Sequence, residues 1–232
     1  MFIPPNRYPT DLLQMREQVL ATLPDIHEKG RVSSCKGYHS QCNSIYCPSC
    51  VRAGLYHRRG RIVTACSSLT ERRRKNLQFA TLLTADVPLE ELRAVAKTSA
   101  DAMRKTLRSV GVSGHVTCAE ISFPRWDDQC HLHYHCLIDS APSGRGYVPK
   151  GALTDAWMSA LPADLLPPLV EVHIKPVDSL EAVATYVCTS PFFDYVKAQA
   201  SLKEVSRTLD AIRETKGLPK ITSRGSLTLP EA

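Results

Sequence analysis

Three histidines alternate with other residues in one short segment, at His131, His133 and His135. In a β-strand, successive side chains point to opposite faces, so these three imidazoles would share one face at a spacing of about 6.6 Å. An exposed polar face with incidental histidines is the alternative, but three of the eight histidines fall within these five residues. The segment therefore predicts a metal site on a strand, although imidazole ligands alone do not decide which metal binds.

Four of the nine cysteines fall within 16 residues, and two of them form the turn Cys47-Pro48-Ser49-Cys50. Zinc takes four thiolate ligands in tetrahedral geometry, and a C-x2-C turn brings two thiolates to one ion. Four unrelated buried cysteines would have no reason to cluster in this way. We predict a structural Zn²⁺ site with the ligands Cys35, Cys42, Cys47 and Cys50, in which His39 could replace Cys35 or Cys42.

The positive charge is concentrated in the segment from Arg52 to Lys75, here called the basic segment. The chain has a formal net charge of +6, and this segment holds eight basic residues against the single acid Glu71. Such a distribution is typical of a surface that binds a polyanion, although a solvated basic helix would have the same composition. The candidate DNA-binding residues are Arg52, Arg58, Arg59, Arg61, Arg72, Arg73, Arg74 and Lys75.

One tyrosine lies off the apolar stripe of its predicted helix. Ser179 is a good N-cap for a helix whose apolar stripe runs from Leu180 to Cys188. At 100° per residue, Tyr186 lies well away from that stripe, whereas a core tyrosine would lie on it. This position favours a functional role for Tyr186.

The elements that must position these residues alternate between strands and helices. The predicted order is Leu77–Thr84 strand, Leu89–Val110 helix, His115–Phe123 strand, Cys130–Asp139 strand, Lys150–Leu161 helix, Leu169–Lys175 strand and the helix from Ser179. This order predicts an α+β fold with a mostly antiparallel sheet and helices packed on one face.

Three parts follow along the chain. Residues 1–75 hold an amphipathic helix that ends near Pro24, a loop-like segment from Gly30 to Cys50, and the basic segment. Residues 76–200 form the α+β core, and residues 201–232 a polar helix with a frayed tail.

The composition excludes the membrane, fibrous and wholly disordered classes. The chain is 43% hydrophobic and 22% charged, and no apolar run approaches the roughly 20 residues that span a bilayer. Met1–Arg7, with two prolines, is not typical of a secretion signal, so we expect a cytoplasmic protein.

The motif H-L-H-Y-H-C-L-I, in a sheet of this order with a tyrosine on a later helix, resembles the HUH endonucleases. The upstream C-P-S-C turn narrows the resemblance to rolling-circle replication initiators of small bacterial plasmids, over roughly Cys35 to Ser190. The resemblance implies an HUH nuclease-like fold. It also implies that His133 and His135, with Glu120 from the preceding strand, hold catalytic Mg²⁺ or Mn²⁺. His131 shares the face of this pair and could bind the ion or hydrogen-bond to one of its ligands.

In this family a helix tyrosine attacks DNA and forms a 5′-phosphotyrosine, and Tyr186 matches that residue. The chain departs from the family's Y-x-x-K pattern because Thr189 stands where lysine is expected, and Tyr195, with Lys197 two residues later, is a competing nucleophile. The implied function is sequence- or hairpin-specific nicking and joining of single-stranded DNA, which starts rolling-circle replication of a plasmid or phage-like element.

The expected partners are origin DNA and host replication proteins such as a helicase, in a bacterial cytoplasm. A single-strand transposase or relaxase with the same chemistry is one alternative. A zinc-containing DNA-binding repressor with a degenerate nuclease fold is another. No nucleotide cofactor is expected, since the chain has no G-x-x-x-x-G-K-[ST] loop.

Overall fold

The computed structural model describes residues 10–36, 41–122, 129–140, 146–188, 201–218 and 221–230. The chain forms two compact units: unit 1 combines Met1–His57 with Ser190–Lys216, and unit 2 combines Arg58–Thr189 with Gly217–Ala232. This division differs from the three consecutive parts expected from the sequence, because the polar helix near the C-terminus belongs to unit 1 and the residues after it to unit 2.

Unit 1 is built from helices around a small apolar core. Its helices are α1 (Thr10–Thr22), α2 (Ile26–Ser34), the first half of α3 (Pro48–Ser67) and α9 (Leu202–Glu214). Apolar residues three or four positions apart on α1 and α9 belong to one buried cluster, among them Leu12, Val19, Val205 and Leu209. Residues 30–34, which were expected to belong to a loop, form the second half of α2 instead. The Asp25 carboxylate caps the first turn of this helix.

Within the described residues, unit 2 contains a six-stranded sheet in the order β5-β1-β4-β3-β6, with β2 also paired to β4. The strands are β1 (Gln78–Leu83), β2 (Val87–Pro88), β3 (Gly114–Ser122), β4 (Gln129–Asp139), β5 (His173–Pro176) and β6 (Ile221–Gly225). Every described strand pair is antiparallel, which confirms the α+β prediction. The histidine strand β4 is central, between β1 and β3, and therefore gives its side chains a rigid base.

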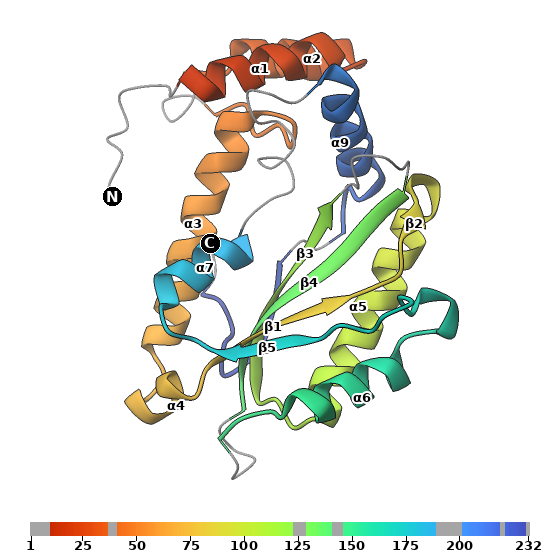
Figure 1. Ribbon diagram of the computed structural model, residues 1–232. Helices are drawn as coiled ribbons and strands as arrows, with labels where there is room; N and C mark the ends of the chain where they lie inside the picture. Colours follow the sequence, from red (N-terminus) through yellow and green to blue (C-terminus); the bar gives the residue numbers. More distant parts are fainter. Residues whose placement is uncertain are drawn as a thin grey trace. The chain divides into compact units, whose positions relative to one another are not determined.

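Helices cover both faces of the sheet, so the prediction of helices on one face is wrong (Figure 1). The 3-10 turn η2 (Leu89–Glu91) leads into α5 (Leu92–Ser109), which packs with α6 (Lys150–Ala160) against the face of Tyr134. The Tyr134 hydroxyl donates to the Ala96 carbonyl of α5, and the Tyr134 ring contacts Trp157 of α6. Helix α7 (Leu180–Cys188) contacts β3 and β4 and lies on the opposite face, where the histidines point.

The two edge strands of the sheet differ from the sequence expectation. Strand β5 is shorter and begins later than the predicted Leu169–Lys175 strand. The tail expected to fray contains β6, which pairs with β3 from Ile221 to Gly225. Gly225 has a φ of 63° and lies so close to the Ser113 carbonyl that a side chain would collide with it, so this strand can end only at a glycine.

The remaining short elements of unit 2 are α4 (Glu71–Lys75) and the 3-10 turn η4 (Ala163–Leu165). Among the described helices, none combines the length and the apolar character needed to cross a bilayer.

His115 on β3 gives unit 2 a specific sensitivity to acid. The residue is buried, and burial lowers the pKa of its imidazole to about 4, with Arg224 and Arg104 acting in the same direction. Its ordinary pKa is near 6.5, so the unfolded chain binds a proton more readily than the folded one between pH 6.5 and 4. The contribution of neutral His115 to the free energy of unfolding is therefore fully present above pH 6.5, and it is lost as the pH falls towards 4.

Between pH 7 and 4.5, the free energy of unfolding of the wild type should fall by about 2–3 kcal/mol because of His115. We expect His115→Phe to lack this part of the decrease. Urea unfolding of both proteins at the two pH values measures this difference. His173→Phe is the matched control because that imidazole is exposed on β5. Equal acid sensitivity of His115→Phe and the wild type would contradict the assignment.

Candidate functional site

Glu120, His133 and His135 come together on the sheet and are here called the Glu120 site. Each offers one ligand atom, and these atoms all lie within 4.8 Å of one another. The cause is the register: Glu120 of β3 lies directly opposite His133 of β4, and His135 is the next residue of β4 on the same face. The structure thus groups the three residues that the resemblance named as metal ligands.

His135 is held in one orientation by three neighbours. Its Nε2 atom contacts the Glu120 carboxylate, and its Nδ1 atom lies 3.3 Å from the hydroxyl of Thr81, its partner across the β1–β4 pair. The Phe79 ring stacks on the imidazole with centroids 5.8 Å apart. When Nδ1–H donates to Thr81, Nε2 carries the lone pair, which is the arrangement that a metal-ligating histidine needs.

The donor set of the Glu120 site fits a divalent cation. Burial lowers the pKa of His133 and outweighs the opposite effect of the Glu120 charge. The imidazole is therefore neutral at neutral pH and has a free lone pair. Two imidazoles and a carboxylate are ligands that divalent ions accept, and the carboxylate favours the harder ions among them.

Tyr186 lies directly against the Glu120 site. Its ring centroid is 4.7 Å from that of His135 and 5.5 Å from that of Phe79, both in edge-on geometry. Ala184 and Val187 of α7 are buried, as the apolar stripe predicted, whereas Tyr186 is 51% exposed. A phenol that is half open to solvent therefore stands beside the candidate metal ligands.

Two arginines of the basic segment act electrostatically on the same helix. Burial raises the pKa of the Cys188 thiol to about 11, while the positive charges of Arg58 and Arg59 act in the opposite direction. The charges of both guanidinium groups therefore act on the last turn of α7, which also carries Tyr186. The Nε atom of Arg58 is buried and has no hydrogen-bond partner within the described part of the chain.

His131 does not join the three ligand atoms of the Glu120 site. Its Nδ1 atom pairs with the carboxylate of Asp86, and its ring lies 6.1 Å from that of His133. Sequence reasoning missed Asp86, Thr81 and Phe79. Thr81 and Phe79 alternate along one predicted strand, so their common face was foreseeable, but which strand would lie beside His135 was not.

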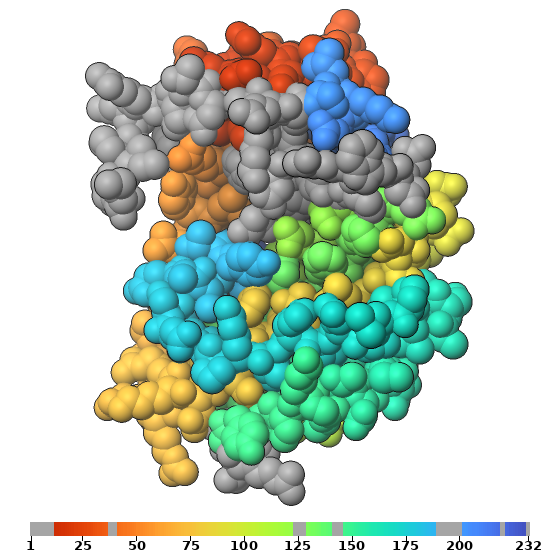
Figure 2. Space-filling view, in the orientation of Figure 1, coloured from red at the N-terminus to blue at the C-terminus, as the bar shows by residue number. Residues whose placement is uncertain are grey.

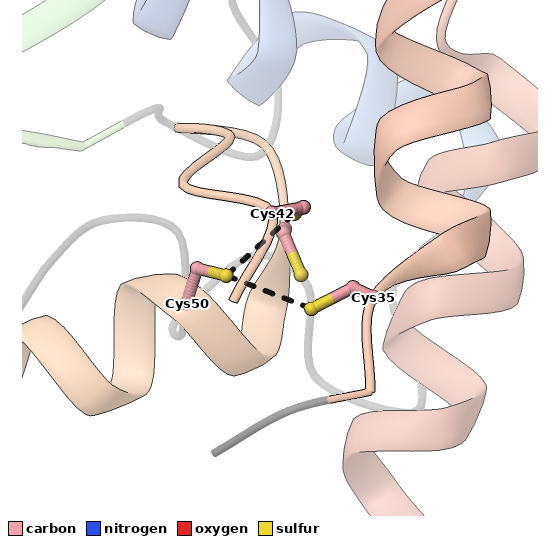
Figure 3. Close-up of side chains that lie close together, drawn as sticks. Cys35, Cys42 and Cys50 are labelled. Atoms are coloured by element: carbon pink, nitrogen blue, oxygen red, sulfur yellow. Dashed lines mark hydrogen bonds between the residues drawn. The ribbon is translucent and has the colours of Figure 1, made fainter. Parts of the chain in front are cut away.

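The four cysteines named as zinc ligands also come together, in unit 1. Figure 3 shows three of them, Cys35, Cys42 and Cys50. Cys35 follows α2, Cys47 precedes α3, and Cys50 lies in the first turn of α3. The Cys50 sulfur is 3.6 Å from the sulfurs of Cys35 and Cys42. This group, the cysteine cluster, can bind a metal ion such as zinc.

The electrostatics of the cysteine cluster favour a cation. Burial raises the pKa of the Cys47 thiol and raises that of Cys50 to about 11, with further contributions from the neighbouring cysteines. Buried thiolates repel one another, so all four deprotonate readily only when a metal ion balances their charge. Cys35 and Cys47 also belong to the apolar core of unit 1, which ties the cluster to the folding of that unit.

The basic segment lies on α3 and α4, and its residues differ in their contacts. Arg73 pairs with the fully buried carboxylate of Asp139, which also accepts a hydrogen bond from Ser226 at 2.6 Å. Lys75 pairs with Glu71 on the surface at 2.8 Å. The side chains of Arg61 and Arg74 donate to backbone carbonyls. Arg52, Arg58, Arg59 and Arg72 have no ion pair within the described residues and stay predicted DNA contacts.

Arg73 is expected to matter for folding more than for DNA binding. Arg73→Gln leaves the Asp139 carboxylate buried without its cation, so we expect the free energy of unfolding to fall by about 3 kcal/mol. Arg74→Gln, at an exposed neighbouring position, should change it by less than about 0.5 kcal/mol. Urea unfolding at pH 7 measures both values, and an unchanged midpoint for Arg73→Gln would show that the ion pair contributes nothing.

Four residues considered in the sequence analysis lie outside the described residues: His39, Thr189, Tyr195 and Lys197. Comparisons with family models, with curated proteins and with solved structures find no match to this chain.

Proposed function

We propose that the chain is an HUH-type endonuclease that nicks and rejoins single-stranded DNA with Tyr186 as its nucleophile. The observation that carries the proposal is the contact between the Tyr186 ring and His135, which itself belongs to the Glu120 site. A half-exposed phenol can act as the nucleophile in a transesterification at phosphorus, and the neighbouring donor set can hold the divalent ion that such a reaction uses.

The chemistry assigned to Tyr186 is one phosphoryl transfer. Its Oη atom attacks the scissile phosphorus, the phenolic proton passes to the solvent around this half-exposed side chain, and the bond from phosphorus to O3′ breaks. The electron pair of that bond stays on O3′, which takes up a proton to become a 3′-hydroxyl. The 5′ phosphate remains on the tyrosine, and reversal of the step joins strands. The 3′-hydroxyl would prime DNA synthesis.

The residues around Tyr186 have supporting roles in this proposal. Glu120, His133 and His135 would hold Mg²⁺ or Mn²⁺, which when bound polarises the phosphate and stabilises its developing negative charge. Thr81 and Phe79 keep the His135 ring in position. Phe79 also contacts the Tyr186 ring and so limits the directions in which the phenol can point.

Arg58 and Arg59 would hold the DNA backbone near Tyr186. Their charges act on Cys188, and the Nε donor of Arg58 lacks a partner within the described residues, as expected of a group that is satisfied when a phosphate binds. We assign further phosphate contacts to the exposed cations of the basic segment, and origin recognition to that segment together with the cysteine cluster.

In the cell, we propose that this reaction starts rolling-circle replication of a plasmid or phage-like element in a bacterial cytoplasm. A host helicase would then unwind the nicked strand. The chemistry of a single-strand transposase or relaxase would be the same, and the DNA sequence that is cleaved distinguishes these functions.

The test uses a pool of labelled single-stranded oligonucleotides with a random centre and fixed ends, incubated with the purified protein and Mn²⁺. We expect a protein–DNA adduct that survives denaturing electrophoresis and does not form when the ion is chelated. Sequencing of the trapped DNA would give the cleavage site. Tight binding of a specific sequence without any adduct, with each of several divalent ions, would favour the repressor instead.

A further inference from the structure

A cavity of about 960 Å³ lies in unit 2, away from the face that carries the Glu120 site. It is bounded by α4, the start of β1, residues 146–150 and the edge strand β5. Figure 2 shows α4, in gold, and the green residues that lead into α6 at the same lower end of the molecule. We call this cavity the Tyr147 pocket; its volume lies within the range of small-molecule and nucleotide sites.

Tyr147 is 59% exposed at this pocket, yet the next residue in the chain, Val148, is buried and hydrogen-bonded to β1. The Val148 backbone N–H donates to the Gln78 side chain at 2.6 Å, and the Gln78 amide donates back to the Val148 carbonyl at 3.2 Å. Gly146 has a φ of 74°, and a Cβ there would lie 3.3 Å from the Asn76 amide. An exposed aromatic ring on an anchored backbone is a preorganised stacking surface.

The charges around this ring are predominantly positive. Arg72, Lys75 and Lys150 are exposed and line the pocket, against the single acid Glu71 among its described lining residues, and Glu71 pairs with Lys75. Single-stranded nucleic acids bind where cations follow the backbone and an aromatic side chain stacks on a base. The Tyr147 pocket combines both features.

The sheet connects this pocket with the nucleophile. Gln78, which anchors the Tyr147 segment, is followed directly by Phe79, whose ring contacts Tyr186. Lys175 of the edge strand β5 lies opposite Phe79 and shares its face of the sheet, and it is exposed. The same strand β5 thus presents Lys175 on the face of Phe79 and Tyr186, and lines the pocket with Ile174 and Pro176.

We propose that the Tyr147 pocket binds a nucleotide of the same single-stranded DNA, beyond the edge strand β5 from the cleaved phosphate, with its base stacked on Tyr147 and its phosphates on Arg72 and Lys150. This inference rests on the proposed function for the identity of the nucleic acid. The position of the pocket adds a subsite that holds the strand during cleavage and joining.

The experiment measures fluorescence anisotropy of a labelled 20-nucleotide oligo(dT) with the full chain. Tyr147→Ala should weaken binding about tenfold or more, whereas Tyr147→Phe, which keeps the ring, should bind as the wild type does. Met158→Ala is the matched control, since Met158 is an exposed apolar residue on α6 that does not line the pocket. Arg72→Gln and Lys150→Gln should each reduce the salt dependence by roughly 0.7 log units per tenfold change in salt.

A second readout locates the base directly. Oligonucleotides with 5-bromodeoxyuridine are cross-linked by ultraviolet light, and mass spectrometry should identify the cross-link at Tyr147. Wild-type affinity of Tyr147→Ala, or no binding of oligo(dT) by the wild type, would overturn this inference. Thymidine monophosphate binding as tight as that of the oligonucleotide would also overturn it, because the pocket would then serve a free nucleotide. The nuclease proposal is judged separately by formation of the Tyr186 adduct, so the two can fail independently.

Discussion

Tyr186→Phe is expected to lower the rate of DNA cleavage by at least about a thousandfold, because the substitution removes only the attacking oxygen. The ring contacts with His135 and Phe79 are retained, and the side chain is half exposed, so the free energy of unfolding should change by less than about 0.5 kcal/mol. Single-turnover cleavage of an end-labelled oligonucleotide measures the rate, and urea unfolding confirms the fold.

Two further sets of variants test the same mechanism: the metal-ligand histidines and the competing tyrosine. His133→Ala and His135→Ala should also stop cleavage but leave DNA binding largely intact, since the proposed DNA contacts come from α3, α4 and the Tyr147 pocket and not from these histidines. Tyr195→Phe should cleave at the wild-type rate. Wild-type cleavage by Tyr186→Phe would remove this tyrosine from the mechanism.

Cys47→Ser is expected to cost the protein its zinc and to unfold unit 1. Cys47 is fully buried and belongs to the same core as α1 and α9, so loss of the metal removes both a cross-link and packing. Structural zinc contributes on the order of 10 kcal/mol to the folding of small domains, which is more than such a unit can lose. Elemental analysis should find one zinc per wild-type chain, and hydrogen exchange should show loss of protection in α1, α2 and α9.

Cys66→Ser is the matched control for this prediction. Cys66 is as deeply buried as Cys47 but lies in unit 2, outside the cysteine cluster. The variant should keep its zinc and the protection of unit 1. A wild type that contains no zinc after purification without added metal would show that the cluster is not a zinc site.

The sequence predicted the histidine face well because strand periodicity leaves little freedom. Once residues 130–139 form a strand, His133 and His135 must share a face. A short connection to the preceding strand then implies a hairpin, in which Glu120 lies opposite His133. The helical position of Tyr186 followed in the same way from its distance to the apolar stripe.

Other features depend on contacts between distant segments and could not be predicted from local patterns. Strand β6 is short and mostly polar, and it forms because β3 offers an unpaired edge. The pairing of Thr81 with His135 depends on which strand lies beside β4, and periodicity does not contain that information. Helix α7 could have covered either face of the sheet.

The basic segment shows the limit of an argument from composition. Its eight cations have the same formal charge, but Arg73 is paired with a carboxylate 66 positions later in the chain. Charge density therefore predicted a polyanion-binding surface without separating residues that stabilise the fold from those left for a ligand.

Mass spectrometry of the trapped protein–DNA adduct tests the central claim most directly. After incubation with single-stranded DNA and Mn²⁺, followed by protease and nuclease digestion, we predict one modified peptide that carries a nucleotide 5′ phosphate on Tyr186. An adduct on Tyr195 or on any other residue would contradict the assignment of the nucleophile. The absence of any adduct on DNA that the protein binds specifically would contradict the nuclease itself.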